Sequence, residues 1–249
     1  IVTGANDFFV VDKETVRRYG FESISFPMLA KSELMTGITY TSQDHDTNSA
    51  EGKAVYLLRF PEKPVAELPA SMAEYIRYGE SLDLHKRFKC RIREPWYVVP
   101  YVWISEVALL KRCHLHPRLV LNKMGAYSTD TAYRIKMRPE YAQRAEDLTF
   151  SFLNSLTFLS AELEGRHYGG GVLELVPSEV ERLLIPLVHA TDQQIATVDR
   201  MIRDKATLDN LLDYADAIIL QDGIGISRME IAVIRETYRK LQHRRLRIK

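Results

Sequence analysis

A chain of 249 residues with 46% hydrophobic side chains can bury a large core, which excludes a disordered protein. Its longest apolar runs, as at 98–104, are far shorter than the roughly 20 residues that span a bilayer, so we predict no membrane segment. Two cysteines are too few for a disulfide framework and indicate a cytoplasmic protein. Because the chain starts with Ile1 and lacks a signal-peptide pattern, we expect it to belong to a longer protein.

The net charge of +1 conceals an uneven distribution along the chain. Residues 85–138 contain twelve Lys or Arg and three Asp or Glu, a net charge of +9, so the remaining residues carry −8. A positive excess of this size in the middle of the chain indicates an anionic partner.

The first 140 residues alternate predicted strands with short helices. Asp12 is placed to cap a helix that Gly20 ends, and Pro69 opens another whose last turn meets Gly79. This mixture predicts an α+β fold with a mixed β-sheet. Runs of β-branched and aromatic residues predict the strands at 1–11, 54–60, 97–103, 118–122 and 131–137.

Helical patterns dominate after residue 140. Apolar residues recur every three or four positions and predict one long core helix that starts near 141 and stops at Gly165. A Ser-x-x-Glu capping box at Ser178 and Glu181 predicts a short helix that ends before Pro186.

The last 60 residues are helical throughout in their pattern. Helices are predicted at 192–205 and 208–220, and a third opens at a capping box of Ser227 and Glu230. We therefore predict a mixed α+β domain over residues 1–188 and a C-terminal α-helical bundle over residues 189–249.

Residues 87–93 alternate strictly between basic and apolar side chains. In a strand this alternation puts all the cations on one face about 7 Å apart, a spacing suited to a phosphate backbone. The alternative interpretation is the solvated outer face of a sheet. The cations are Arg87, Lys89, Arg91 and Arg93, and the opposite face holds Phe88, Cys90 and Ile92.

Aromatic and polar residues accompany this basic segment. Trp96 and Tyr97 could stack on bases, although such residues are more often part of a core. A polar segment at 122–130 lies between two predicted strands and offers groups that read base edges, unless it is an ordinary hairpin loop. Its candidate DNA-binding residues are Lys123, Tyr127, Ser128, Thr129 and Asp130.

Several kinds of catalytic chemistry have no motif in this sequence. An adenine methyltransferase needs an Asn/Asp-Pro-Pro-aromatic motif, and the chain contains no Pro-Pro pair. The glycines at 169–171 follow a helix and precede a strand, the reverse of a cofactor-binding loop, so we interpret them as a tight turn or a close approach to DNA. Cys113, His114 and His116 lack a second pair of ligands with zinc-like spacing. We predict no cofactor and no metal in this chain.

Three segments resemble, in order, the C-terminal target-recognition region of TaqI-class N6-adenine DNA methyltransferases. They are residues 1–9, with the sequence IVTGANDFF, residues 89–97, with KCRIREPWY, and residues 168–175, with YGGGVLEL. The resemblance extends over residues 1–187. It implies a DNA-reading domain joined to an N-terminal domain that binds S-adenosylmethionine and holds a flipped adenine, with double-stranded DNA between the two.

The resemblance also implies roles for particular residues of this chain. The segment that contains Thr3, Asn6 and Phe8 would line the DNA cleft, and a polar turn at Lys31 and Ser32 would touch DNA. The remaining expected DNA contacts are Tyr168, Gly169 and Gly170, in addition to the residues of the basic segment and the polar loop.

Two other assignments remain compatible with these features. In the first, the domain belongs to a specificity subunit or to a fused restriction-modification enzyme rather than to a separate methyltransferase. In a different class, the basic face would dock an acidic protein.

Overall fold

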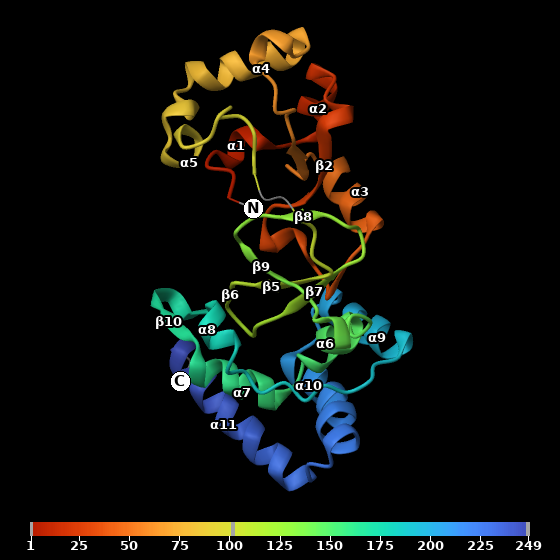
Figure 1. Ribbon diagram of the computed structural model, residues 1–249. Helices are drawn as coiled ribbons and strands as arrows, with labels where there is room; N and C mark the ends of the chain where they lie inside the picture. Colours follow the sequence, from red (N-terminus) through yellow and green to blue (C-terminus); the bar gives the residue numbers. More distant parts are fainter. Residues whose placement is uncertain (1, 101–102, 248–249) are drawn as a thin grey trace. The chain divides into compact units, whose positions relative to one another are not determined.

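The computed structural model describes residues 2–100 and 103–247, which form two compact units (Figure 1). The first unit comprises residues 1–34, 40–105 and 122–130, and the second comprises residues 35–39, 106–121 and 131–249. Helices and mixed sheets occur together, so the predicted α+β class with C-terminal helices is confirmed.

The first unit is built on a sheet with the strand order β1-β4-β2-β8. Strand β4 pairs antiparallel with β1 and β2, whereas β2 pairs parallel with β8. The strands are β1 (Val10–Val11), β2 (Ser25–Leu29), β4 (Tyr56–Leu58) and β8 (Tyr127–Ser128), and the helices are α1 (Asn6–Phe9), α2 (Lys13–Tyr19), α3 (Ser42–Ala50), α4 (Ala70–Ser81) and α5 (Phe88–Arg91).

The predicted signals at the ends of α2 are confirmed. The Asp12 carboxylate accepts a hydrogen bond from the Thr15 amide at 2.8 Å, and Gly20 adopts a left-handed conformation with φ of 66°. Helix α4 follows Pro69 as predicted but continues past Gly79 to Ser81. A Cβ atom at Gly79 would lie 2.6 Å from the Phe8 ring, so glycine here permits close packing.

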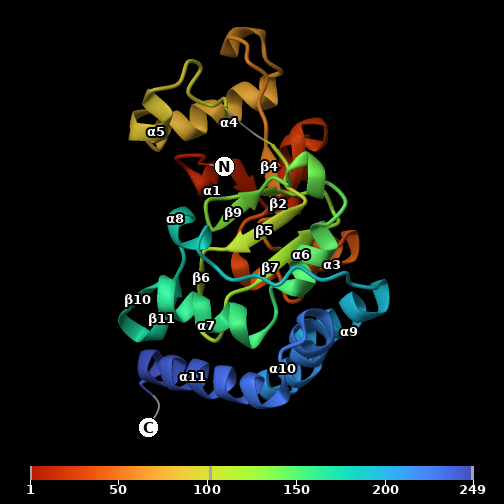
Figure 2. The same ribbon diagram turned by 60° about the horizontal axis from the view of Figure 1, so that its bottom comes forward.

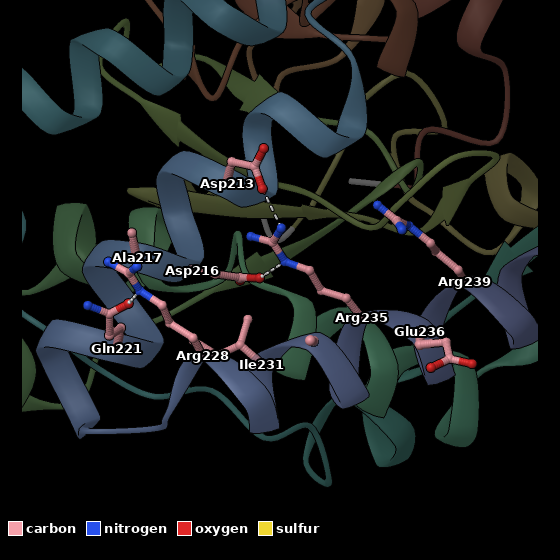
Figure 3. A pocket seen from close by; sticks show the side chains of 10 residues that line it. Asp213, Asp216, Ala217, Gln221, Arg228, Ile231, Arg235, Glu236 and Arg239 are labelled. Atoms are coloured by element: carbon pink, nitrogen blue, oxygen red, sulfur yellow. Dashed lines mark hydrogen bonds and ion pairs between the residues drawn. The ribbon is translucent and has the colours of Figure 1, made fainter.

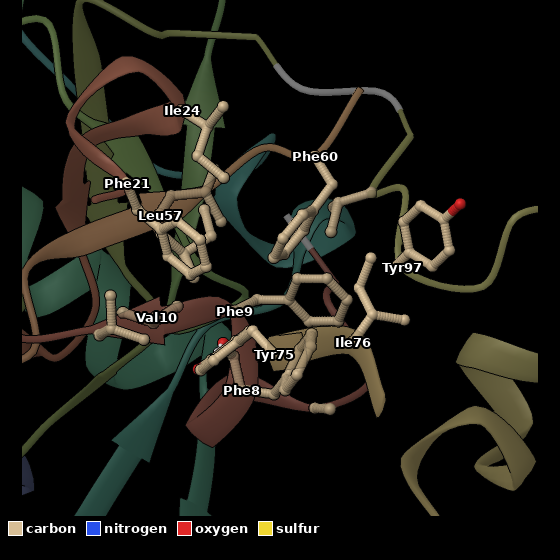
Figure 4. Packing of buried hydrophobic residues seen from close by; sticks show 14 of the residues in the cluster. Phe8, Phe9, Val10, Phe21, Ile24, Leu57, Phe60, Tyr75, Ile76 and Tyr97 are labelled. Atoms are coloured by element: carbon tan, nitrogen blue, oxygen red, sulfur yellow. Dashed lines mark hydrogen bonds between the residues drawn. The ribbon is translucent and has the colours of Figure 1, made fainter. Parts of the chain in front are cut away.

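Aromatic rings fill the core of the first unit (Figure 4). The ring of Tyr75 stacks on Phe8 at 4.6 Å between centroids and meets the edge of Phe21 at 5.3 Å. The Tyr75 hydroxyl donates a hydrogen bond to the carbonyl oxygen of Phe8 at 2.9 Å. This hydrogen bond satisfies the buried hydroxyl group and holds α4 against α1.

The predicted strand at 1–11 begins at residue 1, which lies outside the described residues, and over residues 2–11 it is wrong except for β1. Thr3 Oγ1 donates to Asn6 Oδ1 at 2.5 Å and accepts from the Ala5 amide at 3.2 Å, and these local bonds turn the chain into α1. Phe8 and Phe9 are both buried, whereas a strand would send adjacent side chains to opposite faces.

The predicted strand at 97–103 falls partly on residues 101 and 102, which lie outside the described residues. Its described residues, 97–100 and 103, contain no strand. Pro95 and Pro100 bracket the buried part of this segment and cannot donate to a sheet.

The second unit contains two sheets. One has the order β10-β11-β6 with antiparallel pairing, and the other, with the order β3-β7-β5-β9, belongs mainly to this unit. The predicted strands at 118–122 and 131–137 are confirmed as β7 and β9. The strands are β3 (Thr39–Tyr40), β5 (Val107–Leu110), β6 (Arg112–Cys113), β7 (Leu119–Asn122), β9 (Ala132–Ile135), β10 (Arg166–Tyr168) and β11 (Val172–Glu174).

Helices make up most of the C-terminal half of the second unit. Helix α11 lies along α7 in both views (Figures 1 and 2). The last three predicted helices correspond to α9, to α10 with the π-helical turn that continues it, and to α11. The helices are α6 (Ala145–Ser151), α7 (Ser155–Glu164), α8 (Pro177–Val180), α9 (Asp192–Arg203), α10 (Leu208–Asp216), the π-helix Ala217–Gly223 and α11 (Arg228–Leu246).

The single long helix predicted from 141 to 165 is two helices. The buried Asn154 side chain accepts a hydrogen bond from the Thr157 amide at 2.9 Å and so caps α7. The Asp216 carboxylate accepts from the Ser155 amide at 2.8 Å. These polar groups start a new helix although the apolar periodicity continues.

The capping box predicted at Ser178 and Glu181 is displaced along the chain. Helix α8 begins at Pro177, and the Glu179 carboxylate accepts from the Val176 amide at 2.9 Å. Proline suits the first helical position because it has no amide proton to leave unpaired.

The expected boundary at residue 188 lies inside the second unit. Phe150 and Phe158, which precede it, share one hydrophobic core with Val198 and Tyr238, which follow it. The compact units are therefore divided elsewhere, because these helices bury a common apolar surface.

Candidate nucleic-acid interface

The basic segment at 87–93 is not the predicted strand. Arg87 is the extended residue that precedes α5, and the amides of Cys90 and Arg91 both bond to its carbonyl oxygen at 2.9 Å. Cys90 is fully buried, whereas Phe88 and Ile92 are exposed. A helical turn places the single buried side chain inward, so the cations do not form the expected row.

Arg93 is held by the chain near its start. Its guanidinium donates to the carbonyl oxygens of Thr3 and Val2, both at 2.6 Å. Burial lowers the pKa of Arg93, although the group remains charged at neutral pH. The structure thus joins two segments that the sequence singled out, because Arg93 holds the residues that lead into α1.

A pocket of about 220 Å³ in the first unit gathers three predicted site residues. Asn6 comes from α1, Lys31 follows β2, and Thr129 follows β8. The parallel pairing of β2 with β8 brings the last two together, and Thr129 Oγ1 donates to the Ala30 carbonyl oxygen at 3.0 Å. Sheet pairing therefore joins residues that are 98 positions apart in the sequence.

Charged side chains surround this pocket. Lys31 Nζ lies 3.7 Å from Glu33 Oε1, and both side chains are largely exposed. Lys53 also lines the pocket and lies 4.0 Å from Glu51 Oε2. Exposed pairs at these distances contribute little stability, so either lysine can exchange its partner for a phosphate. Asp7 and Glu33 add carboxylates that can accept hydrogen bonds from base amino groups.

Most of the polar segment at 122–130 is buried, whereas a loop that contacts DNA bases would have to expose its polar side chains. The Asn122 amide group donates to the carbonyl oxygens of Ser105 and Ala126 at 2.9 and 2.8 Å, which closes the turn. Ser128 and Thr129 are 2% and 1% exposed. The predicted contacts that face solvent are Lys123 and Asp130, at the two ends of the segment.

Tyr127 also belongs to the protein interior. Its hydroxyl accepts a hydrogen bond from Arg59 at 2.9 Å, and its ring meets Phe26 edge to face at 6.0 Å. Arg59 lies over both rings, at 5.3 Å from Phe26 and 5.6 Å from Tyr127. This arrangement stabilises the pairing of β2 with β8, which forms one side of the pocket.

The aromatic residues expected to meet DNA are part of the core in this structure. Trp96 packs on Phe8 at 5.2 Å, and its indole donates to the Glu80 carboxylate at 3.1 Å. Tyr97 is 2% exposed and its hydroxyl donates to the Lys63 carbonyl oxygen. Phe8, expected to line the cleft, is also 2% exposed. Their faces are covered by protein, so none of the three can stack on a base in this conformation.

The glycine cluster forms a turn, as one of its two interpretations predicted. Residues Gly169–Gly171 join β10 to β11, and Gly170 has a φ of 75°. Tyr168, at the end of β10, is 48% exposed. Tyr168 and the glycines belong to the second unit, whereas the pocket that contains Lys31 belongs to the first.

A comparison with known protein families shows to which family the chain belongs. The family model described as "Type II methyltransferase M.Eco57I, C-terminal domain" matches residues 1–220. The chain belongs to this family. The expected resemblance to the C-terminal region of a restriction-modification methyltransferase is confirmed at this level.

Two proteins similar to this chain are much longer than it. Type II methyltransferase M.AccI of Acinetobacter calcoaceticus is 22% identical over 222 residues, which cover 86% of this chain and 37% of that protein. The crystal structure of the type IIG restriction endonuclease BpuSI has the same fold, with a TM-score of 0.55 and 11% identity over 97% of this chain and 29% of that one. The chain thus spans about a third of the length of each.

The match to the M.Eco57I C-terminal family covers every predicted site residue and the whole pocket around Lys31. Sequence reasoning missed Asp7, Glu33 and Lys53 in that pocket. No motif links these three positions in the sequence, and only the tertiary structure brings them together.

A second pocket, of about 510 Å³, lies among the last helices (Figure 3). Arg235 bonds to the carboxylates of Asp216, at 2.6 Å, and Asp213, and Arg228 Nε donates to the Gln221 amide oxygen at 3.0 Å. Opposite charges are paired here, so the pocket has no clear preference for an anion. Its lower wall on α11 lies beyond the residues that the family model matches.

We searched the described residues for clusters of metal ligands and for helices that could span a membrane. Across residues 2–100 and 103–247, no three His, Cys, Asp or Glu side chains converge as metal ligands. Within the same residues, every helix is too short or too polar to cross a bilayer.

Proposed function

We propose that this chain is the double-stranded DNA recognition domain of an N6-adenine DNA methyltransferase of a restriction-modification system. The observation that carries the proposal is the pocket of the first unit, where Asn6, Lys31 and Thr129 meet. Cations at its rim suit phosphates, and its carboxylates and amide suit base edges. Membership in the M.Eco57I C-terminal family supports this assignment.

The proposal assigns the chemistry to another part of the parent protein. An N-terminal methyltransferase domain would bind S-adenosylmethionine and the target adenine, which must leave the base stack to be modified. This chain would hold the flanking duplex and select the sequence. A cytoplasmic location agrees with a DNA substrate.

Duplex binding across a salt series tests the proposal. The protein should bind a fluorescein-labelled 30-base-pair duplex with an affinity that falls steeply as salt rises, because lysine contacts release counterions from phosphates. Lys31→Ala should reduce the slope of log affinity against log salt by about one unit. The matched control is Lys13→Ala, which removes an exposed lysine of α2 that does not line the pocket.

Three outcomes separate the alternatives. A lower slope of log affinity against log salt in Lys31→Ala, with an unchanged slope in Lys13→Ala, supports the pocket as the DNA interface. An equal small effect of both variants contradicts it. Absence of salt-dependent duplex binding, together with capture of an acidic polypeptide such as polyglutamate, favours a protein-docking domain instead.

The assignment of adenine is tested in the parent enzyme. Sequencing of modified bases in DNA from cells that express it should find N6-methyladenine at one recurring sequence. The 249-residue chain alone should show no binding of S-adenosylmethionine by calorimetry, since it lacks the Gly-rich loop and the Pro-Pro motif.

A further inference from the structure

Helix α5 presents two apolar side chains to solvent. Phe88 is 60% exposed and Ile92, the residue that ends the helix, is 63% exposed. Residues four apart lie on the same face of a helix, so these two side chains are neighbours. Cys90 lies on the opposite face and is fully buried, which fixes the direction in which Phe88 and Ile92 point.

Two cations flank this apolar pair. Lys89 Nζ and Arg91 Cζ each lie 5.5 Å from the centre of the Phe88 ring. At about 100° per residue, the positions before and after the buried Cys90 fall on the two sides of Phe88. The result is an exposed ring with a positive charge on either side of it.

The surrounding sequence adds charge of the same sign. Residues 86–93 contain five Lys or Arg and no Asp or Glu. An exposed apolar ring costs free energy in water, and a phosphate-binding surface does not need one. The combination suits a duplex in which cations hold the two backbones while an apolar side chain enters between bases.

We propose that Phe88, supported by Ile92, is a wedge that enters the minor groove of double-stranded DNA and opens one base step. Arg87, Lys89 and Arg91 hold the phosphates on both sides of the opened step. The wedge bends the duplex and does not read its sequence. This inference rests on the proposed function, since it names how a second surface of the same domain engages the same DNA.

Binding and bending of a mixed-sequence duplex test the wedge. A 20-base-pair duplex carries a donor dye at one end and an acceptor at the other, so bending raises energy transfer. Phe88→Ala should weaken binding about tenfold or more, because it removes the apolar surface that the ring buries between bases, and should abolish the rise in energy transfer. Phe88→Leu should retain part of both effects.

Two sets of control variants separate the wedge from other effects. Leu82→Ala truncates an apolar side chain of similar exposure, 51%, outside the cation-flanked face and should behave like the unmodified protein. Lys89→Ala and Arg91→Ala should each reduce the salt slope, whereas Phe88→Ala should leave it unchanged. Because Phe88 is exposed, thermal unfolding should be the same for all these variants.

The outcomes distinguish this inference from the function on which it rests. If Phe88→Ala binds and bends DNA like the unmodified protein while Lys31→Ala still lowers the salt slope, the wedge is wrong and the recognition function stands. If the unmodified protein binds without any rise in energy transfer, the wedge is also wrong. If it does not bind duplex DNA at all, both proposals fail.

Discussion

At the scale of single residues, burial decided which of the predicted site residues remain available to a ligand. Trp96 and Tyr97 have the composition of a stacking platform but belong to the core. Arg93 and Arg91 come from the same basic run, yet Arg93 binds carbonyl oxygens of the chain and Arg91 is exposed. Residues of one type in one segment therefore have different roles.

This difference between Arg93 and Arg91 leads to a prediction about stability. Arg93→Ala leaves the buried Thr3 carbonyl oxygen without its charged partner and should lower the free energy of unfolding by about 1 to 3 kcal/mol. Arg91→Ala should change it by less than about 0.5 kcal/mol. Urea unfolding of the two variants checks this, and equal stabilities would show that the Arg93 bonds do not hold the entry segment.

A second prediction at this scale concerns His116. Burial lowers the pKa of His116 to about 4, and its ring stacks on Phe158 at 4.9 Å. The unfolded chain binds this proton near pH 6.5, so between about pH 6.5 and pH 4 the unfolded state holds more protons than the folded state. Stability should therefore fall as the pH is lowered through this window and rise as it is raised.

The test compares the urea midpoint at pH 7 and pH 5 in the unmodified protein and in His116→Phe. Phenylalanine keeps a flat ring against Phe158 and cannot be protonated, so the variant should lose less stability between the two pH values. Equal losses would show that other groups control the acid response.

At the scale of elements, periodicity identified helices but not their ends or their partners. The stripe from 141 to 165 continues across a break, since Asn154 caps α7 while the apolar spacing is preserved. The alternation at 87–93 has a strand period but forms α5, where only Cys90 of the segment is buried.

The pairing of α11 with α7 gives a prediction at this scale. Arg245 and Glu162 form an ion pair in which both side chains are fully buried, with Arg245 Nη2 2.7 Å from Glu162 Oε1. Glu162→Gln leaves a buried guanidinium without a countercharge and should cost about 3 to 5 kcal/mol in stability.

The double variant Arg245→Met with Glu162→Leu removes both charges and should recover a large part of this loss, as measured by thermal and urea unfolding. Recovery will be incomplete because Arg245 also donates to the carbonyl oxygens of His114 and Gly171. A double variant less stable than Glu162→Gln would contradict the buried-charge explanation.

At the scale of the whole molecule, the chain crosses between its two units several times. Asp199 of α9 accepts hydrogen bonds from the amides of Ile38 and Thr39, both at 2.8 Å, although about 160 residues separate them. The C-terminal helices are thus part of the second unit's core and not an appendage to it.

Truncation after residue 188 should therefore unfold the second unit and leave the first unit folded. It would expose Phe150 and Phe158, which pack against the removed helices, so the second unit should unfold. The first unit keeps its whole core, which lies between residues 5 and 127. Hydrogen exchange should show protection lost at 107–164 and retained at 56–79; retained protection at 150–164 would contradict this prediction.

Composition and local pattern determined the α+β class, the helix caps at Asp12, Gly20 and Ser227, the positive middle of the chain and the family resemblance, because each depends on residues close together in sequence. Tertiary structure alone decided that Lys31 and Thr129 share a pocket and that α11 completes the core around Phe158. These outcomes depend on sheet register and on apolar surfaces buried between distant segments, which short-range periodicity does not encode.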